Sequence, residues 1–136
     1  MPSLQPAPTE APQGELTLRT VAMPADTSEK NYIFGGWILS QMDMAASLKA
    51  WLHSGLKVVT VAADGIQFHK PIYVSDEVSC YARVVKVGRT SMEVFVEVWV
   101  RSGRQLTPSC ATTGIFTFVA IDDETGTPIE ITNKLI

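Results

Sequence analysis

The sequence predicts a protein of the α+β class, in which one long helix packs against a single antiparallel sheet. The first observation is the stretch "IFGGWILSQMDMAASLKAW", which is rich in helix-favouring residues and apolar on nearly every side. The second is that almost everything after this stretch alternates as strands do, and the third is one more strand pattern before it. Strands joined by short turns pair antiparallel, so the sheet is expected to wrap around the helix.

The chain begins with a proline-rich segment. Residues 1–14 hold four of the eight prolines among Ala, Gln, Thr and Glu, and this composition predicts a disordered tail. Residues 15–136 are expected to form a single domain, since this length suits one hydrophobic core. Within them, "ELTLRTVAM" alternates as a strand does, and "PADTSEKNY" interrupts the pattern as a loop.

The long helix is predicted from Gly36 to His53. This range contains no proline, and Gly55 follows it as a stop signal. Because apolar side chains occupy nearly every face of the helix, other elements are expected to surround it.

Four strand patterns follow the helix: "LKVVTVAADGIQF" with a bulge or bend at Asp64-Gly65, "DEVSCYARVVKV" and "SMEVFVEVWVR" around the turn "GRT", and "SCATTGIFTFVAI". Alternate residues from Met92 to Val100 are expected to face the helix. The opposite face is expected to carry Phe95, Trp99 and either Phe116 and Phe118 or their neighbours, as aromatic surface that subunit association covers. A sheet wrapped around one long apolar helix is the hotdog arrangement.

The composition argues against several classes of protein. Hydrophobic residues make up 46% and charged residues 18%, which is typical of a globular chain. The net charge of -3 with scattered Lys and Arg argues against a nucleic-acid partner. No apolar run reaches the ~18 residues that span a bilayer, and no signal peptide pattern is present, so no membrane insertion and a cytoplasmic location are expected. Cys80 and Cys110 lack ligand spacing, so we expect no metal and two buried thiols.

Asp43 is an acid in the middle of the apolar helix. Counting by threes and fours places Gly36, Ser40 and Ser47 on its stripe. In one interpretation this stripe faces solvent and Asp43 is an ordinary surface acid. In the other it faces a cleft, where Asp43 acts as general base on water or attacks a carbonyl itself. Gly35 and Gly36 favour the cleft, because free N–H groups at a helix start suit an oxyanion.

The remaining polar residues give weaker signals. His53, at the helix end, and His69, in "FHKPIYV", are predicted to be structural. The turn "VGRTS" is either a plain turn or one that holds a phosphate. The sequence contains neither a GxSxG elbow nor a phosphate-binding P-loop.

Four blocks, "GELTLRTVAMPADT", "IFGGWILSQMD", "VVTVAADGIQF" and "VGRTSMEVFVEVWV", resemble in order and separation the YciA-like acyl-CoA thioesterases of the hotdog superfamily. The resemblance implies hydrolysis of an acyl-CoA thioester to free CoA and a carboxylic acid, with no cofactor, since coenzyme A is part of the substrate. It also implies a homodimer as the minimal active unit, with active sites at the dimer interface, and commonly a trimer of dimers.

The resemblance also assigns residues. It implies that Asp43 is the catalytic acid and that Gly35 and Gly36 polarise the thioester carbonyl. Where the family typically reads Thr-Asn-Ala-Asn-Gly-Asp, this chain has residues 27–32, so Ser28 takes the place of an asparagine that positions the water or the carbonyl. The residues expected to contact the substrate are Asn31, Tyr32 and Phe34 before the helix and Arg89, Thr90 and Ser91 in the turn that meets CoA.

Two alternatives remain open. The altered loop is also compatible with a non-catalytic acyl-CoA-binding oligomer that has lost the chemistry. A hotdog dehydratase or hydratase would need a histidine on or beside the helix to move a proton, and His53 lies at the opposite end from the glycines.

Overall fold

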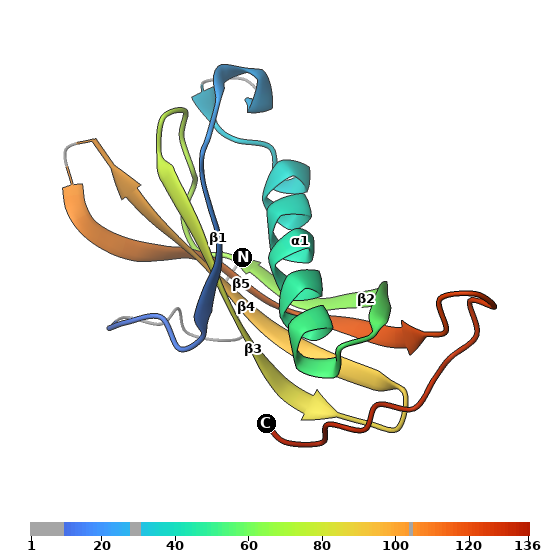
Figure 1. Ribbon diagram of the computed structural model, residues 1–136. Helices are drawn as coiled ribbons and strands as arrows, with labels where there is room; N and C mark the ends of the chain where they lie inside the picture. Colours follow the sequence, from blue (N-terminus) through green and yellow to red (C-terminus); the bar gives the residue numbers. More distant parts are fainter. Residues whose placement is uncertain (1–9, 28–30, 104) are drawn as a thin grey trace.

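The computed structural model describes residues 10–27, 31–103 and 105–136, and it confirms the α+β hotdog fold (Figure 1). In the described part of the chain, five strands form one antiparallel sheet of order β1-β3-β4-β5-β2, with one long helix packed against a face of it. The elements are β1 (Glu15–Val21), the short 3-10 helix η1 (Pro24–Asp26), α1 (Gly35–Ser54), β2 (Lys57–Phe68), β3 (Glu77–Val87), β4 (Ser91–Ser102) and β5 (Gln105–Ile121).

The helix α1 matches its predicted range to within one residue at each end. Gly55 ends it in the left-handed conformation, at a φ of 70°, and its N–H donates to the Trp51 carbonyl at 2.7 Å. The buried face consists mostly of small or unbranched side chains, which let the helix lie close to the sheet: Ile38, Met42, Ala45, Ala46 and Ala50.

The expectation that other elements surround α1 is wrong for a single chain. Met44, Leu48, Trp51 and Leu52 remain exposed, the last at 63%. In the described part of the chain the sheet covers one side of the helix, because β1 to β5 curve around the small-residue face (Figure 1). The apolar residues on the opposite side therefore need another cover.

The core forms between α1 and the inner face of the sheet, as predicted. Alternate residues of β4 from Met92 to Val100 are buried against the helix. Phe116 and Phe118 join them, because the β4–β5 register pairs Phe118 with Met92, and residues directly opposite share a face. The two phenylalanines are thus part of the core, and their neighbours take the outer face.

The prediction of a large aromatic outer surface is also wrong. Trp99 is only 3% exposed within the single chain, and its indole N–H donates to the buried Glu97 carboxylate at 3.4 Å. Phe95 is half-buried under the Arg83 guanidinium, which lies 5.5 Å from the ring centre. Exposed apolar side chains instead gather on α1 and β2, while others lie on β1, in the loop before α1 and at the C-terminus.

The two edges of the sheet differ in character. β1 is short and carries Glu15 and Arg19, a common way of protecting an edge from pairing. β2 is longer and has an uncharged run from Val58 to Ala63, with Val61 55% exposed. Its register shifts on both sides of Asp64, and Gly65 has a φ of 61°, so the bulge or bend predicted at Asp64-Gly65 is confirmed. The β2 edge is therefore the one suited to pairing with another chain.

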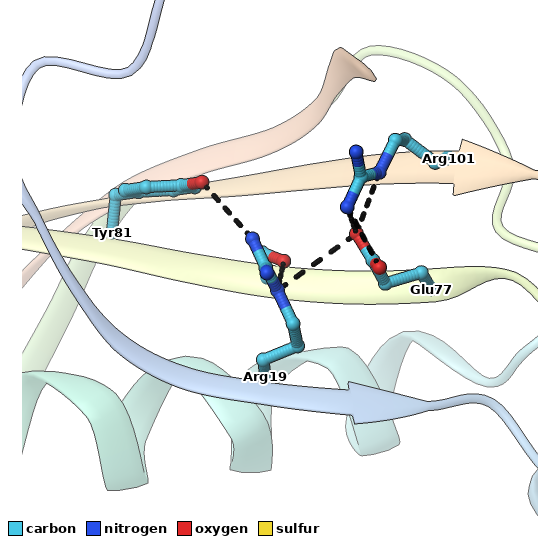
Figure 2. A network of polar contacts seen from close by, with 5 residues as sticks. Arg19, Glu77, Tyr81 and Arg101 are labelled. Atoms are coloured by element: carbon cyan, nitrogen blue, oxygen red, sulfur yellow. Dashed lines mark hydrogen bonds and ion pairs between the residues drawn. The ribbon is translucent and has the colours of Figure 1, made fainter. Parts of the chain in front are cut away.

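The outer face carries a polar network that joins β1, β3 and β4 (Figure 2). Arg101 donates two hydrogen bonds to the Glu77 carboxylate, from Nε to Oε1 at 2.8 Å and from Nη2 to Oε2 at 2.9 Å. Arg19 lies between Glu77 and the Tyr81 hydroxyl. Each exposed ion pair contributes at most about 1 kcal/mol, so the network chiefly fixes β1 on the sheet.

Two other predictions concern the tail and the cysteines. Residues 1–9 lie outside the described residues, while the Gln13 N–H donates to the Glu97 carboxylate at 2.8 Å. Cys80 and Cys110 are both buried, as predicted, and burial raises the pKa of each thiol to about 12. No helix of the described residues is long and apolar enough to cross a membrane.

Candidate active site

Asp43 lies at mid-length on α1 and is half-buried, so it is neither a fully solvated acid nor a core residue. The hydroxyl of Thr60, on the neighbouring edge strand β2, donates to its Oδ1 at 2.6 Å. This is a short hydrogen bond to a carboxylate, and it fixes one oxygen while the other stays available as an acceptor. The acid therefore faces the open β2 edge of the molecule.

The two serines of the predicted stripe do not join this pair. Ser40 and Ser47 each donate to a carbonyl of their own helix, at 2.9 and 3.0 Å, to Trp37 and Met44. Thr60, in contrast, is a site residue that sequence reasoning missed. Nothing in "VVTVAAD" singles out this threonine, because its contact with Asp43 depends on how the helix crosses the strand.

Gly35 and Gly36 are the first two residues of α1, as the oxyanion interpretation needs. The residue before them, Phe34, makes no side-chain cap, and within the described residues no acceptor is found for either glycine N–H. A Cβ at Gly36 would meet nothing within 4 Å, and one at Gly35 would first meet the Phe68 ring at 3.4 Å. The helix start thus presents two backbone N–H groups, those of Gly35 and Gly36, that a ligand can approach, and we call them the bare amides.

The spacing of acid and amides limits how they can act. Gly36 and Asp43 are seven positions apart, or about 10 Å along the axis at about 1.5 Å per residue. A general base must lie within hydrogen-bond reach of its water, and that water must lie within reach of the carbonyl the amides hold. The Asp43 and the helix start of one chain are too far apart to act on the same carbonyl.

The loop before the helix is fixed to the segment that follows β2. Asn31 has a φ of 65°, a conformation that asparagine tolerates well, and its carbonyl accepts the Val74 N–H at 3.3 Å. The rings of Tyr32 and Tyr73 lie 5.2 Å apart, and Phe34 is 52% exposed. Ser28, the position that replaces an asparagine in the resemblance, lies outside the described residues.

A cavity of about 420 Å³ opens between this loop and the end of β2. It is lined by Gly35 at the helix start and by side chains on both sides of it, among them Tyr32, Ile38, Phe68 and Pro71. This volume is within the range of small-molecule sites.

The turn Arg89-Thr90-Ser91 joins β3 to β4 in the short hairpin predicted for it. Arg89 is exposed, and its carbonyl accepts the Ile131 N–H at 2.8 Å, while the Lys134 ammonium donates to the Gly88 carbonyl at 2.9 Å. The C-terminal segment thus supports the turn from behind and adds a second cation near Arg89.

The two histidines have structural partners. His53 exchanges hydrogen bonds with Asn133, at 3.0 and 3.1 Å, which ties the helix end to the C-terminal segment. His69 is half-buried, and its Nε2 lies 2.9 Å from the Thr113 hydroxyl. Burial lowers the His69 pKa from 6.5. The described residues contain no group of three or more His, Cys, Asp or Glu side chains that could hold a metal ion.

One long helix packed against a single antiparallel sheet is the architecture of a hotdog-fold thioesterase among the solved structures that this chain resembles. Residues 30–107 match the family model described as "Thioesterase superfamily". This chain therefore belongs to the thioesterase superfamily.

Relatives and solved structures agree with this membership. A protein of Zymomonas mobilis named "uncharacterized acyl-CoA thioester hydrolase" is 53% identical over 84% of this chain and 76% of its own length. The acyl-CoA thioester hydrolase YciA of Escherichia coli is 44% identical over 83% of this chain and 88% of its own. The hexameric thioesterase of Yersinia pestis superposes with a TM-score of 0.84 at 46% identity, covering 89% of this chain and 98% of that one. The hexameric hotdog fold thioesterase of Campylobacter jejuni has a TM-score of 0.80 at 42% identity, covering 88% and 91%.

Proposed function

We propose that this chain hydrolyses acyl-CoA thioesters to free CoA and a carboxylic acid, in sites that two copies of the chain build together. The observation that carries the proposal is the half-buried Asp43 carboxylate, fixed at one oxygen by Thr60 beside an uncovered sheet edge. The relatives support the substrate class, since they are acyl-CoA thioester hydrolases by name.

Asp43 acts as the general base. With Oδ1 occupied by Thr60, Oδ2 accepts a proton from a water molecule, and the water oxygen attacks the thioester carbonyl carbon. The negative charge that develops on the carbonyl oxygen is met by the N–H groups of Gly35 and Gly36 and by the positive end of the helix dipole. The C–S bond then breaks, and the CoA thiolate leaves and takes up the proton from Asp43.

The base and the amides come from different copies of the chain. Because they are about 10 Å apart on one helix, Asp43 of one copy works with Gly35 and Gly36 of the other. Pairing of two β2 edges would bring the helices together and cover exposed Met44 and Leu48. We propose a homodimer as the minimal active unit and, by analogy with the hexameric neighbours, a trimer of dimers.

The rest of the substrate is held by the loop and the turn. Tyr32 lines a cavity together with Gly35, and Phe34 directly precedes that glycine. We propose that Asn31, Tyr32 and Phe34 contact the substrate and that Ser28 helps position the water or the carbonyl. Arg89, Thr90 and Ser91 meet the CoA portion, whose phosphates suit an exposed arginine. The reaction needs no cofactor, and we propose that it takes place in the cytoplasm.

A second chemical route uses the same acid. Asp43 attacks the thioester itself, CoA leaves, and water hydrolyses the mixed anhydride. In a single turnover in ¹⁸O-labelled water, label in the Asp43 carboxylate identifies the anhydride route, and it is left there when water attacks the Asp43 carbon of the anhydride.

The activity is tested by free-thiol release from a panel of acyl-CoAs from acetyl to palmitoyl, with one aromatic ester. We expect saturable, enzyme-dependent release of CoA. Saturable binding of these esters without release from any of them would contradict hydrolysis and would establish the alternative, a non-catalytic acyl-CoA-binding oligomer.

A further inference from the structure

The cavity beside the helix start has walls that are mainly apolar. Ile33, Ile38 and Ile72 form its buried part, with exposed fractions of at most 7%. Phe68 and Tyr32 face it from the more exposed sides, at 53% and 39%. Gly35 also lines the cavity, so it opens next to one of the bare amides.

The two polar side chains of the lining have partners elsewhere. His69 Nε2 lies 2.9 Å from the Thr113 hydroxyl, and the Lys70 ammonium donates to the Ser109 hydroxyl. Both partners belong to β5, and neither borders the cavity. The cavity therefore offers mainly hydrocarbon contacts, and the Lys70 ammonium in its lining donates to a neutral hydroxyl.

Tyr32 is held firmly in the wall. A β-bridge joins it to Tyr73, and the two rings lie 5.2 Å apart and tilted by 36°. The next residue, Ile33, donates its N–H to the Ile72 carbonyl at 2.9 Å. Hydrogen bonding between the two hydroxyls raises the Tyr73 pKa. These contacts fix the Tyr32 backbone and place its ring beside Tyr73 in the cavity wall.

We propose that this cavity receives the acyl group of the thioester, that it takes an uncharged hydrocarbon acyl group, and that Tyr32 sets the length that fits. The inference rests on the proposed function, because the carbonyl must sit at the Gly35 and Gly36 amides for its acyl chain to enter here. With Tyr32 in place, short acyl groups are favoured over long ones.

The test is the ratio of kcat/KM for octanoyl-CoA to that for butyryl-CoA. Tyr32→Ala should raise this ratio by about tenfold or more, the discrimination typical of small size changes in an apolar pocket. Tyr32→Phe keeps the ring and loses only the hydroxyl, so it should change the ratio far less than Tyr32→Ala does. Tyr81→Ala, which removes an aromatic ring from the opposite face of the sheet, is the control and should also leave it unchanged.

Pro71→Trp serves as a second variant, since Pro71 is an exposed part of the same wall. It narrows the cavity and should lower the ratio by a similar factor, even if Tyr32→Ala fails to fold. An active wild type whose ratio is unmoved by Pro71→Trp and by a folded Tyr32→Ala overturns the inference and leaves the proposed function standing.

A wild type that hydrolyses none of the esters contradicts the proposed function instead. The cavity is then tested by calorimetric binding of octanoyl-CoA and butyryl-CoA to the same variants. A shift of the affinity ratio in the directions given above supports the subsite, and an unchanged ratio overturns it.

Discussion

Replacement of Asp43 by asparagine separates catalysis from folding in this chain. In the wild type the Thr60 hydroxyl lies 2.6 Å from Asp43 Oδ1. The side-chain carbonyl oxygen of an asparagine at this position can still accept a hydrogen bond from that hydroxyl. Loss of the negative charge weakens this bond, so we expect a stability change of about 1 kcal/mol. For a chain of this length that corresponds to a melting shift of about 4 °C.

The effect on activity should be far larger. An amide cannot take a proton from water, and a positioned general base contributes about 10²–10⁴-fold. This corresponds to about 3–5 kcal/mol of activation free energy, several times the expected loss of stability. The assay is kcat/KM for thiol release from butyryl-CoA, measured beside a thermal melt of the same preparation.

Asp123→Asn is the matched control for this substitution. Asp123 is 84% exposed and lies 3.7 Å from the Lys57 ammonium, so its replacement should change neither rate nor stability appreciably. A folded Asp43→Asn protein whose kcat/KM stays within twofold of wild type would show that Asp43 does no proton transfer.

Two further predictions concern residues around the site. Thr60→Val removes the hydroxyl that orients Asp43, so steady-state kinetics should show kcat lowered by about tenfold with little change in KM. Thr60→Ser keeps a hydroxyl and should restore most of the rate. An unchanged kcat for the valine variant would rule out the positioning role. His69 has a pKa lowered by burial, so the unfolded chain binds its proton more readily, and stability should fall as the pH drops below about 6.5. Urea denaturation between pH 7.5 and 5 would measure this, and His69→Gln should have a flatter profile; identical slopes for the two proteins would contradict the assignment.

Local patterns were sufficient to predict the elements. Helix-favouring residues and Gly55 predicted α1, the valine alternation predicted the buried face of β4, and Asp64-Gly65 predicted the irregularity in β2. Each of these features depends on residues close together in the chain. The glycines at the helix start were also predicted correctly, since capping is a local property.

Features that depend on tertiary register were missed or left open. The Thr60–Asp43 bond joins residues on two elements, and the burial of Phe116 and Phe118 follows from the β4–β5 pairing. The location of the uncovered apolar surface, on α1 and β2 instead of the outer sheet face, follows from how far the sheet curves. No pattern in a single sequence fixes these relations.

In the proposed shared active site, one thioester lies between Asp43 of one copy of the chain and the helix start of another. Gly35→Pro removes one of the bare N–H groups where a helix tolerates proline, and Phe34, at φ -58° and ψ 138°, already has the conformation favoured before proline. Both Asp43→Asn and Gly35→Pro should be nearly inactive alone. The deciding measurement is thiol release after the two inactive proteins are unfolded together and refolded in equal amounts.

Random pairing places an intact Asp43 opposite an intact Gly35 in about one quarter of the sites of a two-fold dimer. The mixture should therefore recover about one quarter of wild-type activity. A mixture no more active than the average of its two parents, in a sample where mixed dimers are demonstrated, would contradict the shared site.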